Sequence, residues 1–409
     1  MKINTFKLHS LKIPFVLVRK SNKSNFCYIQ FKDKESSTRI IIRKKMINYI
    51  HIDGYKSIKE ASFSLDPINV LIGSNGVGKS NFISFFKMVN NIYEERLENY
   101  SIRKGAETLL HFGSKNTNEI KGRLEFDNIN AYSFTLQPTE SNSLILADET
   151  GSFNSEKGSQ FSYINTWFPK NISRNSKESK LRTTKGSMST YISRYLSSFK
   201  IYHFHDTSDS SSLRTPADLN DNIALREDGG NLASFLYFLQ EVHEKHFRRI
   251  EYIVKSVAPY FERFQLQPDR LNESRINLEW TEINHPDILF NASHFSDGTL
   301  RFIALATLLM QPNMPEVIII DEPELGLHPV AINTLAGLIK KASAKSQIII
   351  STQSVNLVGN FEPDNIITVD RVDGQSVFNR LEKENLEGWL SDFTLGDLWL
   401  KNIIKGQPY

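Results

Sequence analysis

The stretch Gly73-Ser74-Asn75-Gly76-Val77-Gly78-Lys79-Ser80 decides how the rest of the chain is interpreted. It matches the spacing G-x-x-x-x-G-K-S and stands between an expected buried strand, Ile68 to Ile72, and an expected helix from Lys79 to about Tyr100. Its glycines let backbone N–H groups converge on phosphate oxygens, and the start of the helix adds the positive end of a dipole. The sequence therefore predicts a loop that binds phosphate groups.

Two side chains of this loop are expected to complete the site. Lys79 would reach the β- and γ-phosphates of a nucleotide, and Ser80 would offer its hydroxyl to Mg²⁺. A chance glycine turn is the alternative, and the strand-helix context together with the Lys-Ser pair argues against it. The expected nucleotide-binding set is Gly73, Ser74, Asn75, Gly76, Val77, Gly78, Lys79, Ser80 and Asn81.

A second expected strand ends in two carboxylates. The apolar run Val317 to Ile320 is typical of a buried parallel strand, and Asp321 and Glu322 follow it directly. Ligands of open α/β sheets bind at the C-terminal ends of the strands. We expect Asp321 to hold Mg²⁺ and Glu322 to orient the attacking water. Glu322 and Lys79 are thus both expected to be catalytic residues. An acidic helix cap after a core strand is the alternative.

The segment Phe295 to Arg301 opens a further expected helix. Ser296 and Gly298 stand at its start, where a helix N-terminus offers a second phosphate site. The segment resembles the signature motif of ABC-type ATPases, in which the signature of one subunit closes over the nucleotide held by the other. The resemblance implies that Ser296 and Gly298 bind ATP in trans and that the chain forms a homodimer or a higher homo-oligomer. An ordinary serine cap on a core helix is the alternative.

Two more segments fit this resemblance. The loop Pro323 to Pro329 would contact the partner subunit, and the buried run Ile348 to Ile350 leads to the family's switch position. That position usually holds His, whereas Gln353 stands here. Gln353 can hydrogen-bond a γ-phosphate or water in a catalytic role, but it carries no charge, which argues against fast autonomous hydrolysis. Gln137 is the candidate for the family's glutamine loop.

The run Ile52 to Ile58 and the sequence Asp321 to Pro329 look like the RecF, SMC and OLD branch of ABC-type ATPases. The resemblance covers residues 46–140 and 290–409. Tyr202 to Ser208 and Leu395 to Trp399 look like coiled-coil-free ATPase subunits of bacterial anti-phage systems, including Septu-like and retron-linked ones. This second resemblance implies an ATP- and Mg²⁺-dependent ATPase that gates a separate effector such as a nuclease. The alternatives are a RecF-like repair or recombination ATPase, and an ATP-stabilised scaffold or antitoxin with little turnover.

The expected fold is α/β, an ABC-type P-loop head with a β-rich N-terminal subdomain and an inserted helical lid. An apolar stripe over residues 232–264 predicts two helices for the lid. An extension over residues 1–45 is expected to be either a β-rich addition or a segment before an alternative start at Met46. The N-terminal part of the head, with the P-loop, is expected over 46–140, and the inserted lid or arm over 141–275. The C-terminal part of the head, with the signature, the Walker B strand and the switch, is expected over 276–409.

The inserted region offers two further candidate sites. Cations interleaved with aromatic residues could contact nucleic acid by neutralising phosphates and stacking on bases, with a solvated mobile loop as the slightly favoured alternative. The pair His203 and His205 could bind a metal from one face of a strand, and a structural or nucleotide-adjacent role is the favoured alternative. The interleaved residues are Arg174, Lys177, Lys180, Arg182, Lys185 and Arg194 with Tyr163, Trp167, Tyr191 and Tyr195.

Composition sets the class of the whole chain. Its 409 residues carry a formal net charge of +3 and are 40% hydrophobic, enough for a globular core. The single cysteine, Cys27, excludes an internal disulfide. The sequence has neither an apolar run that could cross a bilayer nor the pattern of a signal peptide. We therefore expect a cytoplasmic protein without a membrane partner.

Overall fold

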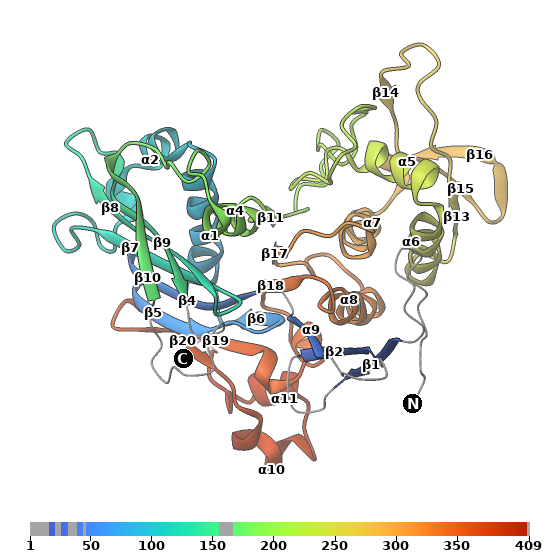
Figure 1. Cartoon of the computed structure of the whole chain (residues 1–409). Coiled ribbons are helices and arrows are strands. Elements are labelled where there is room, and N and C mark those ends of the chain that lie inside the picture. The colour runs from blue at the N-terminus through green and yellow to red at the C-terminus, as the bar shows by residue number, and fades with distance from the viewer. Residues whose placement is uncertain (1–15, 21–25, 32–38, 44–45, 155–166, 407–409) are drawn as a thin grey trace.

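A six-stranded sheet in the order β11-β17-β18-β6-β19-β20 forms the centre of the protein (Figure 1). The computed structural model describes residues 16–20, 26–31, 39–43, 46–154 and 167–406. The first five strands of the order run parallel, and only β20 is antiparallel. The strands are β6 (Ile68–Ile72), β11 (Lys200–Tyr202), β17 (Val317–Asp321), β18 (Gln347–Thr352), β19 (Ile366–Val372) and β20 (Gln375–Arg380).

Helices cover both faces of this sheet, which explains its continuous apolar strands. On β17, Val317 and Ile319 pack in one core with α1 (Lys79–Tyr93), whereas Ile318 and Ile320 pack in another with α7 (Asp297–Met310) and α8 (Pro329–Ala342). Successive side chains of a strand point to opposite faces, so each core receives every second residue. The residues at the C-terminal ends of β17, β18 and β6 therefore meet at one edge of the sheet.

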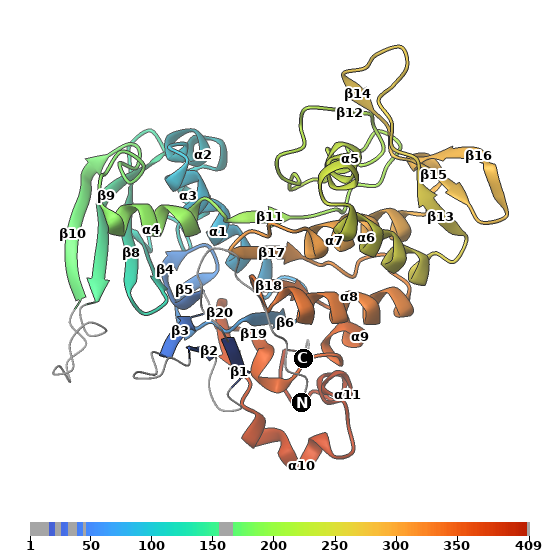
Figure 2. The ribbon, with the colours of Figure 1, turned by 45° about the vertical axis from the view of Figure 1, so that its right-hand side comes forward.

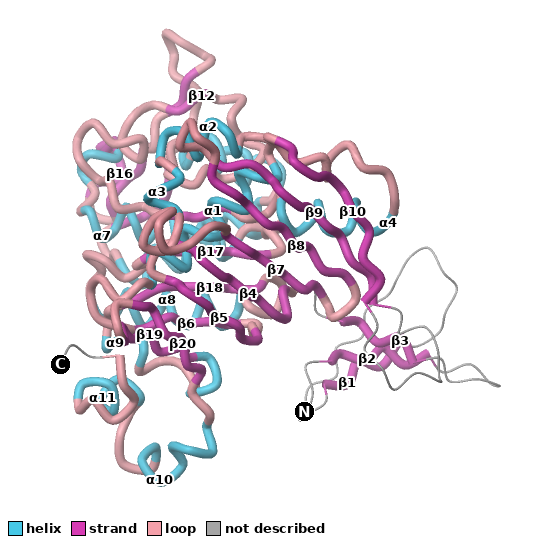
Figure 3. Tube along the Cα trace, turned by 90° about the vertical axis from the view of Figure 1, so that its left-hand side faces the viewer, coloured by secondary structure: helices cyan, strands magenta, loops and turns pink. Residues whose placement is uncertain are grey.

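A second sheet of six antiparallel strands, in the order β10-β9-β8-β7-β4-β5, packs on the other side of α1 (Figure 3). Gln347 of β18 joins the two sheets, because its Oε1 accepts from Ile47 N at 3.0 Å and its Nε2 donates to Ile47 O at 2.9 Å and to Asp66 O at 3.0 Å. The strands are β4 (Ile47–Tyr55), β5 (Ile58–Ser64), β7 (Ile120–Phe126), β8 (Asn130–Pro138), β9 (Leu144–Asn154) and β10 (Trp167–Ser176).

This antiparallel sheet continues past residue 140, where the inserted region was expected to begin. β8 and β9 pair from Asn130↔Phe153 to Pro138↔Leu144, and Leu144 and Leu146 belong to the same core as α1. The helix α4 (Ser187–Leu196) packs on this sheet as well. The lid helices therefore follow β11 in the structure, whereas Leu144, Leu146, Ile192 and Leu196 belong to the core between α1 and the antiparallel sheet.

The lid lies on the opposite side of the central sheet (Figure 2). The two helices expected over residues 232–264 are confirmed as α5 (Leu232–Val242) and α6 (Glu244–Val257), but residues 261–264 form a strand. Small sheets complete the lid, and α7 leads from it back to the central sheet. Their strands are β12 (Ala217–Asp218), β13 (Phe261–Phe264), β14 (Arg275–Ile276), β15 (Glu279–Glu282) and β16 (His285–Asn291).

The single helix expected from Lys79 to Tyr100 is wrong, because α1 ends at Tyr93 and α2 (Leu97–Lys104) follows. Glu95 adopts a left-handed conformation with φ 57°, which breaks the helix. The carboxylate of Glu178 then accepts hydrogen bonds from Leu97 N at 2.8 Å and Glu98 N at 3.0 Å. A residue some 80 positions away thus satisfies the start of the second helix.

The remaining elements lie at the periphery. The described parts of the N-terminal segment form a separate antiparallel sheet of β1 (Val16–Lys20), β2 (Phe26–Phe31) and β3 (Arg39–Arg43). No helix among the described residues combines the length and the apolar character needed to cross a bilayer. The other helical elements are α3 (Ala106–Leu109), η2 (Ala292–His294), α9 (Val355–Val358), η3 (Pro363–Asn365), η4 (Lys383–Leu386), α10 (Glu387–Leu390) and α11 (Leu395–Leu400).

Candidate nucleotide-binding site

The glycine-rich loop connects β6 to α1, as its sequence predicts. Gly76 and Gly78 adopt φ values of 78° and 118°, a region that side chains with a Cβ rarely enter. Lys79 is 5% exposed, and its Nζ donates to Gly73 O at 2.6 Å and to Ser74 O at 2.9 Å. The loop therefore wraps around its own lysine, whose ammonium group lies where two carbonyl oxygens converge.

A serine from the C-terminal hairpin holds this loop in place. Ser376 Oγ donates to Val77 O at 2.6 Å and lies 2.6 Å from Ser57 Oγ. A Cβ on Gly78 would overlap Ser376 Oγ, so the hairpin and the loop fit together only with glycine at that position. Nothing in the sequence near Ser376 marks this contact, and sequence analysis missed it.

The two carboxylates at the end of β17 are held by neighbouring strands. Ser351 Oγ donates to Asp321 Oδ1, and Glu322 N donates to Ser351 O at 3.0 Å. Glu322 has a left-handed backbone with φ 42°, a conformation that costs a residue with a Cβ about 1–2 kcal/mol. The Nε2 of Gln353 donates to Glu322 Oε1. The predicted switch residue thus touches the predicted catalytic carboxylate directly.

A third carboxylate, Glu324, lies half-buried beside this pair. Its Oε1 accepts from Thr352 Oγ1 at 2.6 Å and from Gln353 N at 3.1 Å, whereas its Oε2 is buried with no hydrogen-bond partner among the described residues. Burial raises the pKa of the Glu324 carboxyl. Its contacts fix the backbone of Gln353, so Glu324 has a positioning role that the sequence did not reveal.

The carboxylates of Asp321, Glu322 and Glu324, together called the acidic edge, act electrostatically on the lysine of the glycine-rich loop. Burial lowers the pKa of Lys79, and the nearby negative charges of Glu322, Asp321 and Glu324 partly offset that effect. The residues predicted from two segments more than 200 positions apart are therefore close enough to influence one another. A buried cation at the same sheet edge as several carboxylates is the arrangement that a nucleotide with its Mg²⁺ would complete.

The predicted signature residues lie at the start of α7. Ser296 is the N-cap of this helix, and its Oγ accepts from Thr299 N at 3.2 Å. Gly298 packs closely on the loop Pro323 to Pro329 that follows Glu322, here called the acidic loop. A Cβ on Gly298 would overlap the carbonyl oxygen of Gly326 in this loop. Within one subunit, Ser296 therefore acts as an ordinary helix cap. Its binding to the ATP of a partner subunit is a prediction about the dimer.

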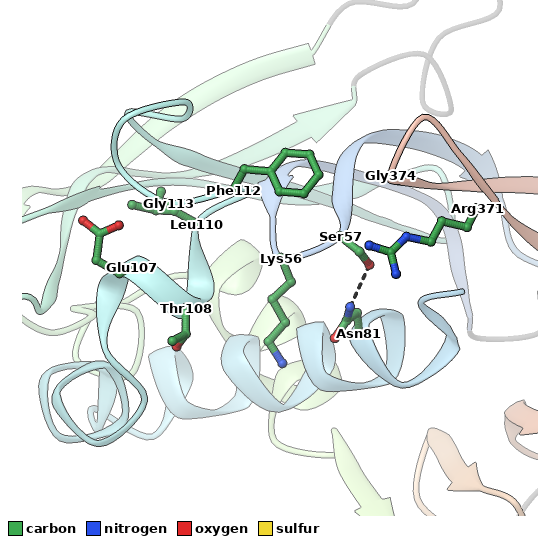
Figure 4. Close-up of a pocket in the computed structure, with 10 residues that line it drawn as sticks. All are labelled: Lys56, Ser57, Asn81, Glu107, Thr108, Leu110, Phe112, Gly113, Arg371 and Gly374. Carbon is green, nitrogen blue, oxygen red and sulfur yellow. Dashed lines mark hydrogen bonds between the residues drawn. The ribbon is translucent and has the colours of Figure 1, made fainter. Parts of the chain in front are cut away.

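An open cavity of about 550 Å³ is lined by Asn81, which lies in the first turn of α1 directly after the glycine-rich loop (Figure 4). In it, Asn81 of α1 donates to Ser57 Oγ at 2.7 Å. Burial, together with the nearby charge of Lys104, lowers the pKa of Lys56 to about 8. The lining also includes Phe112 and Arg371, so the cavity offers two cations and an aromatic ring beside the phosphate loop.

His203 and His205 do not form a metal site with other described residues. His203 Nδ1 lies 3.1 Å from Ile201 O, and His205 Nε2 lies 3.0 Å from Asp321 O. Within the ranges that the structure describes, no group of three or more His, Cys, Asp and Glu side chains could hold a metal ion. His205 instead supports the backbone of Asp321, which agrees with the structural, site-adjacent alternative.

Two other sequence-based candidates have different surroundings from those expected. Gln137 lies in β8, where it pairs with Ile145, so it belongs to a strand of the outer sheet instead of a loop at the site. In the basic segment, Arg174, Lys177, Arg182 and Arg194 form ion pairs, and Tyr163 lies outside the described residues. The partners of these cations are Asp148, Glu98, Glu94 and Glu316, respectively.

Comparisons with known proteins place the chain in a class. Residues 68–359, well over half of the chain, match the family described as "AAA domain, putative AbiEii toxin, Type IV TA system". The chain belongs to this family of P-loop ATPases. A curated relative, the energy-coupling factor transporter ATP-binding protein EcfA of Methanocaldococcus jannaschii, is 41% identical over 66 residues, which are 16% of this chain and 23% of that protein. The chain thus aligns with less than a quarter of this relative.

Solved Smc head domains share the fold. One, bound to the C-winged helix domain of ScpA, is 18% identical with a TM-score of 0.50 and covers 83% of this chain and 99% of its own. Another, from Pyrococcus furiosus with an extended coiled coil, is 16% identical with a TM-score of 0.51 and covers 85% and 99%. The expected fold class, an ABC-type head with a β-rich N-terminal sheet, is therefore confirmed.

Proposed function

We propose that this chain binds and hydrolyses ATP at the P-loop, dimerises around it, and uses this cycle to gate a separate effector, a nuclease, in anti-phage defence. The observation that carries the ATPase proposal is the parallel pairing of β17, β18 and β6, which brings Asp321 and Glu322 to the same sheet edge as the loop that holds Lys79. A cation that neutralises phosphates and a carboxylate that orients water are the two requirements for phosphoryl transfer to water.

The residues at the loop fit a nucleotide with Mg²⁺. Gly76 has nothing within 4 Å of the position a Cβ would take, which leaves room for a phosphate above the loop. Lys79 would exchange its two carbonyl partners for phosphate oxygens. The hydroxyl of Ser80 and the carboxylate of Asp321 offer the hard oxygen ligands that Mg²⁺ prefers. When bound there, Mg²⁺ neutralises charge that develops on the phosphates.

The nucleoside end of ATP and the attacking water can also be assigned to residues of the chain. We assign the cavity beside Asn81 to the nucleoside end of ATP, because it adjoins the loop and offers Lys56, Phe112 and Arg371. Glu322 would align water for in-line attack, and Gln353 would hold its carboxylate in orientation. Hydrolysis by this arrangement consumes one water and releases ADP and phosphate.

Dimerisation is the next step of the proposal. Ser296 and Gly298 would bind the γ-phosphate of ATP held by the partner subunit, at the positive end of the α7 dipole. Leu325 in the acidic loop and Val330 in the first turn of α8 are 45% and 53% exposed. Exposed aliphatic side chains next to the two predicted phosphate sites support a contact face for a second head.

A separate effector is the next part of the proposal. No cluster that could hold a further metal occurs in the described ranges. The family description names a type IV toxin–antitoxin system, which supports a role in which one protein controls another. The pairing of four cations in the basic segment weakens the alternative of a RecF-like ATPase that binds DNA through this segment.

A scaffold or antitoxin with little turnover is the second candidate. The hydrogen bond from the neutral Gln353 to Glu322 favours it, because a catalytic carboxylate already engaged by the protein is less free to polarise water. Tight ATP retention with negligible phosphate release would mark this function.

Two measurements test the proposal. Phosphate release by the purified chain, with and without duplex DNA, separates an ATPase from a scaffold, and strong DNA stimulation would favour the repair function. A phage challenge of cells then compares the chain alone with the chain and its neighbouring genes. Full protection by the chain alone would overturn effector gating.

A further inference from the structure

The segment from His203 to Thr207, which follows β11, lies between the predicted signature helix and the acidic edge. The Nε2–H of His205 donates to Asp321 O at 3.0 Å. Arg301 of α7 donates from Nε to Phe204 O at 3.1 Å and from Nη2 to His205 O at 2.7 Å. These bonds connect α7 to the residue that ends β17.

The same arginine also holds the acidic loop. Its Nη1 donates to Leu325 O at 2.8 Å, and a Cβ on Gly326 would lie 2.6 Å from this nitrogen. Gly298, three residues earlier on α7, packs against the carbonyl of Gly326. Helix α7 therefore touches this loop at two positions on one face, and the loop directly follows Glu322.

The chemistry of these contacts requires a guanidinium group. Arg301 makes four hydrogen bonds, the fourth from Nη2 to Thr207 Oγ1 at 3.3 Å, and every acceptor is a carbonyl or hydroxyl oxygen. A planar group with five donors can span these acceptors, whereas a lysine ammonium offers one point of attachment. Lysine at this position would therefore keep the charge and lose most of the connections.

A second arginine holds the other end of the segment. The side chain of Arg214 is 6% exposed and donates to Thr207 O at 2.8 Å, Ala292 O at 2.7 Å and Asp297 Oδ1 at 2.8 Å. Arg214 thus anchors the start of α7 to Thr207. Arg301 continues this connection to Leu325 and, through His205, to Asp321.

We propose that Arg301 is a positioning residue that couples the two ATP sites of the dimer. Within one subunit it ties Ser296, which serves the nucleotide of the partner subunit, to the strand end that carries Glu322 and serves the subunit's own nucleotide. A shift of α7 on closure is therefore transmitted to the hydrolytic carboxylate. This inference rests on the proposed ATP-sandwich function and adds the residue that carries its coupling.

The first test compares Arg301→Met and Arg301→Lys with Arg249→Met, an exposed arginine on α6. We expect kcat to fall about tenfold or more in both Arg301 variants, because sub-ångström misplacement of a reacting group has effects of this size. ATP binding by the monomer should change less than about twofold, since the P-loop is untouched. The Hill coefficient for ATP should fall toward one, which a merely structural loss would not cause.

His205 provides a variant that leaves Arg301 intact. His205→Phe removes the donor to Asp321 O and should lower kcat, whereas His205→Gln keeps an N–H donor and should restore most of it. Equal activity of the two variants, at melting temperatures close to that of the wild type, would overturn the role of this link.

Mixed dimers decide between coupling and a local role. One subunit carries Lys79→Ala, so that a single ATP site remains, and Arg301→Met is placed in either subunit. Coupling predicts slower turnover in both placements. Arg301→Met in the subunit with Lys79→Ala should act through Ser296, and Arg301→Met in the other subunit should act through Glu322. A loss in only one placement would overturn coupling. Absence of ATP-dependent wild-type dimers would instead overturn the proposed function itself.

Discussion

The glycine-rich loop and the acidic edge lie on opposite sides of the same site, but they are built differently. The loop is a run of eight consecutive residues, shaped by glycines with positive φ and by an external hydrogen bond from Ser376. The acidic edge is assembled from β17, β18, α7 and the segment after β11, which side chains such as Arg301 and Glu324 hold together. Substitutions elsewhere in the chain should therefore impair the loop less than they impair the acidic edge.

The largest expected effect is on the acidic edge itself. Glu322→Gln should reduce phosphate release by roughly 100-fold or more, the scale of a lost catalytic base, while ATP binding persists. ATP should then hold the dimer closed, as measured by light scattering. Glu387→Gln, an exposed change on α10, is the control. A Glu322→Gln chain that stays monomeric in saturating ATP would contradict the sandwich arrangement.

Gln353 tests how the edge is held. Gln353→Ala removes the donor to Glu322 Oε1, and we expect kcat to fall about tenfold because the carboxylate loses its orientation. Gln353→His, which keeps an N–H donor, should recover part of this loss. Faster turnover of Gln353→Ala would show instead that the hydrogen bond restrains Glu322, as the scaffold alternative requires.

Ser376 is the corresponding test on the loop. Ser376→Ala leaves Val77 O without its side-chain donor, and loss of one buried hydrogen bond of about 1 kcal/mol corresponds to roughly fivefold weaker ATP binding. Binding of a fluorescent ATP analogue measures the effect, with the exposed Ser391→Ala as control. An unchanged dissociation constant would mean that the glycines alone shape the loop.

The smallest expected effect concerns pH and Lys56. With a pKa of about 8, Lys56 loses its proton between about pH 7 and 9, and ATP affinity should fall about threefold, the size of a screened charge pair. Stability should change in the opposite direction: the unfolded chain binds this proton more tightly, so the free energy of unfolding rises as pH passes 8. Titrations of Lys56→Met should lack both trends, whereas Lys341→Met should retain them.

The sequence predicted those parts of the site that depend on consecutive residues. The glycine spacing identified the loop, and the apolar run before Asp321 identified its strand, because local backbone rules and sheet burial produce those patterns. Ser376, Arg214 and Arg301 were missed because they bind backbone carbonyls, which every residue presents, and such contacts leave no pattern in a sequence. The break after Tyr93 was missed for a related reason, since the cap comes from the distant Glu178.

The amide of Gln347 has a mechanical consequence. Its three hydrogen bonds to Ile47 and Asp66, two of them buried, fasten the antiparallel sheet to the central sheet, so these two layers should respond to force as one rigid block. The lid instead leads back to the central sheet through α7, the helix that would move on closure. If α7 shifts on closure as proposed, a partner attached to the lid would move with that helix, whereas a partner attached to the antiparallel sheet would stay with the central sheet.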